Sequence, residues 1–204
     1  MRRTFGYLIL ALALGAASAA AQQKQPTYDD IYCSGQVTKE SIPYDTYLIS
    51  GEESAPKNTF SWGDYVYINK GSGDGVKVGD EFLVMRPVSD PVKIKWFESQ
   101  PVLVRAIGQQ WLDVGRLRVV VLHPKVSIAQ VVHTCGYLQR GDYVRPFAAR
   151  SAPTFAEGKI DHFAPVNGRP LGMVVNSKNY IRQVATRDII YVNLGSAQGV
   201  KEGD

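Results

Sequence analysis

Histidine and cysteine are the side chains here that could support covalent or metal chemistry, and the sequence has few of them. It contains three histidines, His123, His133 and His162, and two cysteines. A hydrolase needs a nucleophile beside a base, and no Gly-x-Ser-x-Gly motif is present. His133 lies two residues before Cys135, so on a strand both side chains would share one face and offer half of a metal site. Ordinary packing of both side chains is the favoured alternative, and we predict a non-enzymatic protein with no catalytic residue, cofactor or metal.

The two cysteines, Cys33 and Cys135, could form one disulfide. A disulfide needs an oxidising compartment, and this one would close a loop of about 100 residues, which contributes up to about 4–5 kcal/mol in the chain-entropy account. The bond also requires Cα atoms within about 7 Å, which sequence spacing does not determine. Two buried free thiols therefore remain the alternative.

Aspartate and glycine residues cluster where turns are expected. Asp64, Asp80, Asp142 and Asp188 lie beside glycines or at strand starts, which favours turn capping over paired acid catalysis. The three glycines of residues 71–75 lack the lysine and following helix of a phosphate loop. The three tryptophans and 11 tyrosines could form a sugar or peptide platform, although packing on strand faces is the favoured use.

The N-terminus has the pattern of an export signal. Arg2 and Arg3 precede a short apolar segment at residues 7–15, and alanines at 19–21 offer a cleavage site. We therefore predict a signal peptide over residues 1–21, with an uncleaved anchor as the alternative, and a mature protein in the periplasm or at the outer-membrane periphery. The net charge of +4 includes both arginines, so the mature chain is only weakly basic and nucleic acid is not an expected partner.

The composition predicts a mostly β protein. With 19 glycines, 11 prolines and 11 tyrosines, the chain favours short strands and turns. After a flexible lead-in at 22–30 we expect a β-barrel domain over 31–147, a proline-containing linker over 148–170 and a further unit over 171–204. The expected strands are near 31–38, 42–50, 65–68, 81–85 (ended by Pro87), 115–122, 126–133, 143–144 (stopped by Pro146) and 172–175, with a short helix near 101–108.

Residues 64–80 return near the end of the chain as residues 188–204. Ten of the 17 aligned positions are identical, which indicates duplication. The preceding strands also correspond loosely, Gly35-Gln36-Val37 to Gly172-Met173-Val174. Turns need glycine, asparagine and aspartate, so the shared positions are assigned a structural role: Asn69, Gly71, Gly75, Gly79, Asp80, Asn193, Gly195, Gly199, Gly203 and Asp204.

The duplication predicts a small SH3-like or closed β-barrel followed by an incomplete second copy of the same unit. The second copy stops within its turn. A half barrel would leave an open strand edge, so we expect a truncated product; the alternative is that the tail adds a strand to a partner.

The order of motifs resembles a known family. YVYINKGSGDGVKVGDEFLVMRPV, then GRLRVVVLHPKVSIAQVV and QRGDYVRP, is similar to the C-terminal β-barrel domain of flagellar assembly protein T and to uncharacterised exported proteins of Gram-negative, particularly acidobacterial, bacteria. The turn also resembles one in the rod-shape-determining protein C, a periplasmic scaffold. Neither family implies an active site, and the N-terminal domains of the flagellar protein have no counterpart here.

These observations predict a non-enzymatic exported cell-envelope module that binds or scaffolds through protein–protein contacts. The alternative is a peptidoglycan- or carbohydrate-binding module. The expected partner is accordingly an envelope protein or peptidoglycan, and no integral membrane span is expected after signal cleavage.

Overall fold

The structure is a computed structural model of the 204-residue chain, and it describes residues 25–53, 55–90, 95–152, 163, 165, 168 and 170–202. The signal peptide predicted over 1–21, most of the linker predicted over 148–170, His162, and the turn residues Gly203 and Asp204 lie outside the described residues. The elements are α2 (Tyr28–Tyr32), β1 (Gln36–Thr38), β2 (Leu48–Gly51), β3 (Thr59–Phe60), β4 (Tyr65–Ile68), η1 (Ser72–Asp74), β5 (Glu81–Val88), α3 (Gln100–Ile107), β6 (Gln109–Leu122), β7 (Ser127–Thr134), β8 (Leu138–Gln139), β9 (Tyr143–Pro146), β10 (Val174–Ser177), η2 (Lys178–Tyr180), β11 (Ile190–Val192) and η3 (Ser196–Gln198).

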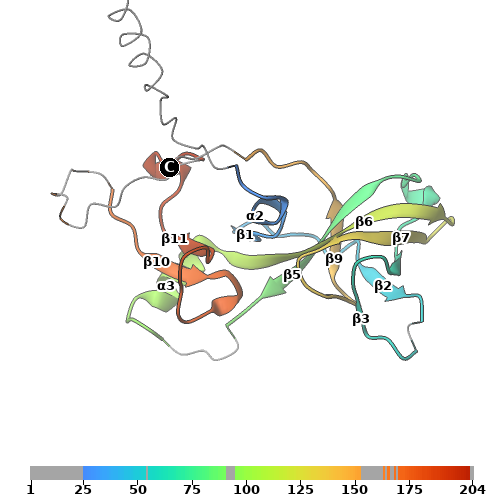
Figure 1. Cartoon of the computed structure of the whole chain (residues 1–204), viewed down its shortest axis with the longest axis horizontal. Helices are drawn as coiled ribbons and strands as arrows, with labels where there is room; N and C mark the ends of the chain where they lie inside the picture. The colour runs from blue at the N-terminus through green and yellow to red at the C-terminus, as the bar shows by residue number, and fades with distance from the viewer. Residues whose placement is uncertain are drawn as a thin grey trace, which may run out of the picture.

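The prediction of a mostly β protein is confirmed. One antiparallel sheet has the strand order β2-β4-β7-β6-β5-β9, and β1 pairs with the start of β6. β6 is 14 residues long, and Figure 1 shows it running from α3 at one end of the molecule to the hairpin with β7 at the other. Because β6 is long, one part of it pairs within the packed sheet and its start contacts the unit that contains β10 and β11.

The first and last strands of this order meet. The Leu48 N–H donates to the Asp142 carbonyl at 3.0 Å, and the Val144 N–H donates to the Thr46 carbonyl at 2.9 Å. An antiparallel bridge joins Tyr47 with Tyr143 between these bonds. The assignment to a closed SH3-like barrel stays a prediction.

The inward-facing side chains of this sheet form an apolar core. Alternate residues of β4 point inward, so Val66 and Ile68 are buried while Tyr65 is exposed. Removing such aliphatic side chains from water is the main force that holds a small sheet together. The buried cluster consists of Leu48, Phe60, Val66, Ile68, Phe82, Val84, Val114, Leu117, Val119, Ala129, Val131, Leu138 and Val144.

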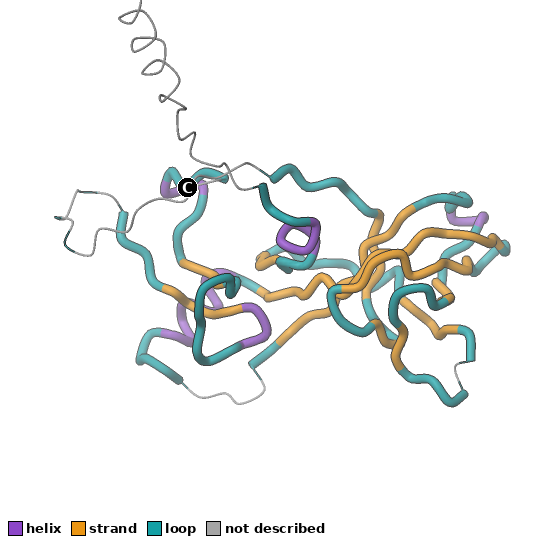
Figure 2. The backbone as a smooth tube through the Cα atoms, viewed as in Figure 1, coloured by secondary structure: helices purple, strands orange, loops and turns teal. Residues whose placement is uncertain are grey.

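A second unit, residues 170–202, contains the antiparallel β10–β11 hairpin and the turns η2 and η3. It packs beside α3 and the start of β6, as the backbone tube in Figure 2 shows. Gln110 of β6, which is buried, makes two bonds to it: its Nε2 donates to the Ser177 carbonyl at 3.4 Å, and its Oε1 accepts from Asn176 Nδ2 at 2.8 Å. The second unit is therefore fastened to the first through a buried polar contact.

Several of the expected elements differ from the structure in their bounds. The strand expected over 31–38 is only β1 at its end, because α2 precedes it. Thr27 caps this helix: its Oγ1 accepts from the Asp30 N–H at 3.2 Å, and Asp30 Oδ2 accepts from the Thr27 N–H at 2.8 Å. Reciprocal bonds of this kind satisfy free N–H groups at a helix start.

Pro87 does not end β5, which continues to Val88. β9 pairs with β5 only as far as Met85, whereas β6 pairs with it beyond Pro87. A residue with no N–H is tolerated where one strand edge is free. The short helix expected near 101–108 is confirmed as α3.

Candidate functional site

The predicted chemical residues do not converge on a catalytic pocket in the described part of the chain. His123 is exposed in the turn before β7, whereas His133 is half-buried at the far end of β7. A strand separates the two imidazoles, so they do not act on one substrate as a base and an acid. His162 lies outside the described residues.

Cys33 and Cys135 form a disulfide with their Cα atoms 5.3 Å apart. The bond joins the residue that ends α2 to the loop that follows β7. It closes a chain separation of 102 residues, which places it among the long loops that restrict an unfolded chain most. The N-terminal helix is thereby fixed against the sheet.

The duplicated turn has the same geometry in both copies. In the first copy the Gly71 N–H donates to Asp74 Oδ2 at 3.0 Å, and in the second the Gly195 N–H donates to Gln198 Oε1 at 2.9 Å. The glycine that follows each 3-10 turn has a φ of 84°, a left-handed value that favours glycine: Gly75 and Gly199. The turn is therefore an architectural unit in both places.

The strand before the repeat also has a counterpart, but not the one expected. Asn69 Oδ1 accepts from the Tyr47 N–H at 2.7 Å, and Asn193 Oδ1 accepts from the Met173 N–H at 2.7 Å. Met173 therefore corresponds to Tyr47, and the β10–β11 hairpin corresponds to the β2–β4 hairpin, including a bulge at the same place. The predicted correspondence of Gly35-Gln36-Val37 with Gly172-Met173-Val174 is wrong, because β1 pairs with β6.

The four aspartates cap turns, as predicted. In each case a carboxylate oxygen accepts from the backbone N–H three residues earlier, at 2.7–2.9 Å. Burial raises the pKa of Asp64, but hydrogen bonds from Lys57 and from the Ser61 N–H outweigh it and leave that pKa below its ordinary value. The residues are Asp64, Asp80, Asp142 and Asp188.

The two hairpins present opposite faces to the rest of the protein. The second hairpin packs inward through Val175, which is buried, while its counterpart Ile49 is exposed. The side chains that correspond to the core of the first hairpin face solvent instead. Their exposed fractions, each with its counterpart, are Val174 48% (Leu48 0%), Ile190 40% (Val66 0%) and Val192 41% (Ile68 1%).

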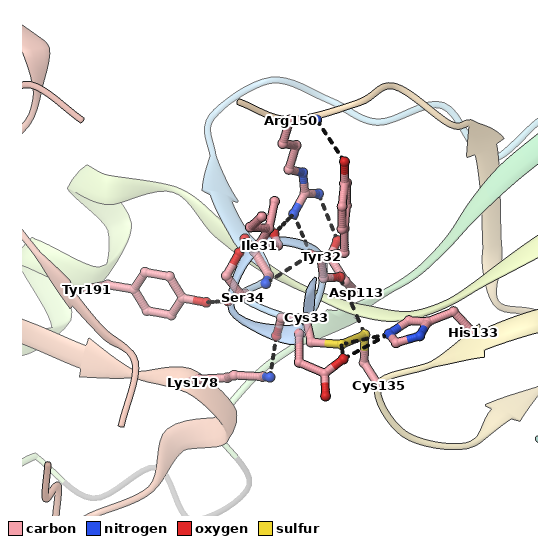
Figure 3. Close-up of polar contacts among 12 residues, drawn as sticks. Ile31, Tyr32, Cys33, Ser34, Asp113, His133, Cys135, Arg150, Lys178 and Tyr191 are labelled. Carbon is pink, nitrogen blue, oxygen red and sulfur yellow. Dashed lines mark hydrogen bonds and ion pairs between the residues drawn. A yellow bond between two sulfur atoms is a disulfide. The ribbon is translucent and has the colours of Figure 1, made fainter. Parts of the chain in front are cut away.

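Polar contacts around the disulfide hold the second unit in this orientation, as Figure 3 shows. The Tyr191 hydroxyl donates to the Ser34 carbonyl at 3.1 Å, and Lys178 Nζ donates to the Cys33 carbonyl. Burial raises the pKa of the Tyr191 phenol, so this hydroxyl remains a donor at neutral pH. The inward-facing side of the second hairpin is thus occupied, and its other side is free of such contacts among the described residues.

A buried ion pair lies in the same region. Arg150 contacts both carboxylate oxygens of Asp113, at 2.6 and 3.0 Å, and the Gly35 N–H donates to the same carboxylate at 3.0 Å. The Asp113 side chain is fully buried. The hydrogen bond to Asp113 raises the pKa of Arg150, and the pair fastens the segment after β9 to β6 (Figure 3).

A groove of about 980 Å³ opens between α3, residues 38–42 and the end of β5. At its base the Trp111 ring meets the edge of Tyr143 with centroids 4.8 Å apart. Trp111 Nε1 is buried and has no hydrogen-bond partner in the described part of the chain. The floor is apolar, and the rim carries charges: Lys39, Glu40, Lys95 and Arg105.

The tryptophans do not form a shared platform. Trp111 is in the groove, Trp96 lies under the Arg182 guanidinium at 5.3 Å, and Trp62 is exposed in the turn before β4. The favoured prediction, packing on strand faces, describes Trp111 alone. Sequence spacing does not show which of the three tryptophans lie together in the fold.

Comparisons with protein-family models, with curated proteins and with solved structures found no match. The resemblance to flagellar assembly protein T therefore remains a prediction. Among the described residues, no helix is both long and apolar enough to cross a membrane.

Proposed function

We propose that this protein is a non-enzymatic module of the cell envelope that binds an extended strand of a partner protein along β11. The observation that carries the proposal is the β10–β11 hairpin. It repeats the bonding of the β2–β4 hairpin, yet it exposes the side chains that correspond to the core of the first unit. Exposed apolar faces of this kind are typical of interaction sites.

In the described part of the chain no strand lies beside the outer edge of β11, and the backbone before this strand resembles the backbone before β4, whose edge is covered. In the first unit β7 covers β4: the Gly63 N–H donates to the Val131 carbonyl and the Val131 N–H donates to the Asp64 carbonyl, both at 2.9 Å. The corresponding residues are Arg187 and Asp188. Arg187 has a φ of 80°, close to the 87° of Gly63, so the backbone immediately before β11 turns as it does before β4, where β7 pairs.

The first unit also indicates the chemistry of the occupant. β7 presents Ala129 and Val131 to the core and Gln130 to the other face. The proposed partner segment is therefore an antiparallel strand with small or β-branched apolar residues at alternate positions. Completing the burial of three aliphatic side chains that are 40–48% exposed contributes about 1 kcal/mol each, and new backbone hydrogen bonds add to this.

The proposal also includes an oxidising cell-envelope compartment and a binding role without catalysis. The export-signal pattern at residues 1–21 and the Cys33–Cys135 bond both suit an oxidising compartment such as the periplasm. Separation of His123 from His133 by the length of β7 supports a binding role over acid–base catalysis.

The test uses a synthetic peptide with the sequence of residues 126–134, which contains β7. Fluorescence anisotropy should detect binding of the labelled peptide to the oxidised protein, and Val192→Lys should weaken it at least tenfold, because the charge lies on the exposed face. Val120→Lys, on the similarly exposed Val120 of β6, is the matched control and should bind as the wild type does. The proposal is overturned if the peptide does not bind or if Val192→Lys binds equally well.

Sedimentation of the protein alone tests whether β11 pairs with a second copy of this chain instead of a partner protein. If the chain dimerises, and Val192→Lys abolishes the dimer, β11 pairs with another copy and the partner-strand proposal is wrong. A monomer that binds the peptide supports it.

The groove favours a second candidate, binding of peptidoglycan or another carbohydrate. An aromatic floor with a charged rim suits sugar rings. Purified, protein-free sacculi should then retain the protein, and Arg105→Glu should reduce retention while Val192→Lys leaves it unchanged. Failure of the sacculi to retain the protein would eliminate this candidate.

A further inference from the structure

Four side chains from two distant segments of the chain, residues 29–33 and 133–135, converge at the disulfide. Cys33 ends α2, His133 is near the end of β7, and Cys135 follows it. Asp29, on the first turn of α2, brings a carboxylate to the same place. The Sγ atoms of both cysteines and an imidazole nitrogen of His133 all lie within 4.8 Å of one another, as Figure 3 shows for the cysteines and His133.

Three of the distances within this cluster are close to the edges of a metal tetrahedron. His133 Nε2 lies 3.4 Å from Cys33 Sγ and 3.2 Å from Asp29 Oδ1, and Cys33 Sγ lies 3.9 Å from Asp29 Oδ1. Zinc ligands at their usual bond lengths of about 2.0–2.3 Å are separated by about 3.3–3.8 Å when the geometry is tetrahedral. Once reduction separates the two bonded sulfurs, one ion between them could contact His133 and, after rotation of its exposed side chain, Asp29.

We propose that this cluster binds one Zn²⁺ when the disulfide is reduced, through Cys33, Cys135, His133 and Asp29. Two thiolates, an imidazole and a carboxylate form a ligand set that zinc accepts. In the oxidised protein the two sulfurs are bonded to each other, so the disulfide and the zinc site exclude one another. The two segments that carry the cysteines are thus joined in either of two ways, by the disulfide or by the zinc ion.

The exchange balances with a dithiol or phosphine as reductant. Reduction adds two electrons and two protons to the disulfide and leaves two thiols. A dithiol supplies both and becomes its own disulfide, or a phosphine supplies the electrons and becomes its oxide, with one water giving the oxygen and the two protons. Zn²⁺ then displaces the two thiol protons to solvent as it binds the thiolates. Oxidation by a disulfide oxidant reverses the sequence and releases the ion.

The surroundings allow entry while they hold the ligands in place. Cys33 is buried and the His133 side chain is half-buried, whereas the Asp29 side chain is 73% exposed and opens the site to solvent. The edge of the His133 ring meets Tyr28 with centroids 4.4 Å apart. The Cys33 carbonyl is held by Lys178, so the backbone at this ligand is fixed independently of the disulfide.

The test compares the oxidised full chain with the chain reduced by a phosphine, each titrated with Zn²⁺ alone against a chromophoric chelator. We expect one Zn²⁺ per reduced chain with sub-micromolar affinity and none per oxidised chain. His133→Asn should weaken binding at least tenfold and Asp29→Asn by a smaller factor. His123→Asn removes a histidine remote from the site and should bind as the wild type does. Co²⁺ should give the sulfur-to-cobalt charge-transfer band of two thiolates in tetrahedral geometry.

A second measurement distinguishes binding at the folded site from binding to a chain that unfolds on reduction, because an unfolded chain binds zinc through its cysteines alone. Near-ultraviolet circular dichroism of the reduced chain should return to the oxidised spectrum when Zn²⁺ is added. The proposal is overturned if Zn²⁺ does not restore that signal to an unfolded reduced chain, if the oxidised chain binds equally well, or if His133→Asn has no effect on affinity.

Discussion

The side-chain oxygen of Asn193 accepts a hydrogen bond from the backbone N–H of Met173 at 2.7 Å. This bond ties the start of β10 to the end of β11, and the Asn193 N–H returns a bond to the Met173 carbonyl at 3.2 Å. The hairpin of the second unit is thus closed by its own side chain, without help from the large sheet. It can present a defined edge even though no strand lies beside it in the described part of the chain.

Replacing Asn193 by alanine should loosen this hairpin and leave the first unit intact. The lost bond is worth about 1 kcal/mol, and hydrogen–deuterium exchange should become faster in β10 and β11 only. Asn69→Ala removes the same bond within the large sheet, so global unfolding in urea should detect its loss. Asn58→Ala, in an exposed loop, is the control. Equal exchange in Asn193→Ala and wild type would contradict a structural role for this side chain.

Arg86 supports a carboxylate that is buried in the turn before β9. The Asp142 side chain is 1% exposed and accepts two bonds from Arg86, at 2.7 and 2.8 Å. Arg86→Met leaves that carboxylate unpaired, which should reduce the free energy of unfolding by about 3–5 kcal/mol. Arg118→Met breaks a pair with Glu81 in which the arginine is 54% exposed, and should cost less than about 1 kcal/mol.

A double variant separates the charge from the packing. Adding Asp142→Asn to Arg86→Met removes the unpaired charge, so urea denaturation should show recovery of part of the loss. No recovery would mean that Arg86 acts through its packing and its bond to the Tyr137 carbonyl.

The turns could be predicted from the sequence, whereas the face that the second hairpin buries could not. Aspartate and glycine determine turns through bonds to residues three positions away, so the turn at Gly71 and its copy at Gly195 could be predicted. Helix α2 was missed although Thr27 and Asp30 form the pattern of a capping box. The alternation of β11 shows that one face is apolar, but Ile190 is exposed only because the second unit packs through its opposite side.

The candidate sites depend on contacts between distant parts of the chain. The spacing of His133 and Cys135 indicated a shared strand face, yet nothing near them in the sequence signals Asp29, which α2 delivers. In the same way, the edge-to-face contact of Trp111 with Tyr143 joins β6 to β9. Contacts between residues so far apart in the sequence depend on sheet topology, which local sequence patterns do not determine.

Arg187 carries a local strain that glycine would relieve. Its φ of 80° lies in the left-handed region, where the first copy has Gly63 with a φ of 87°. Arg187→Gly should therefore stabilise the second unit by about 0.5–1 kcal/mol. Gly63→Ala should destabilise the first unit by about 1 kcal/mol, although no atom lies within 4 Å of the added Cβ. Thermal unfolding measures both changes, and a loss of stability in Arg187→Gly would show that the arginine side chain makes a compensating contact.

Asp64 should make stability depend on pH at the acid end. Burial opposes ionisation, but the hydrogen bonds from Lys57 at 2.7 Å and from the Ser61 N–H at 2.8 Å leave the folded-state pKa below the ordinary value. A lowered pKa means that the contribution to stability is present above the unfolded-state pKa and is lost as pH falls through the folded-state pKa. Urea unfolding across that range should therefore show a shallower decline for Asp64→Asn, which is less stable than wild type at neutral pH and approaches it in acid. Asp45→Asn alters an exposed carboxylate and should preserve the wild-type decline; an unchanged slope in Asp64→Asn would assign the acid sensitivity to other carboxylates.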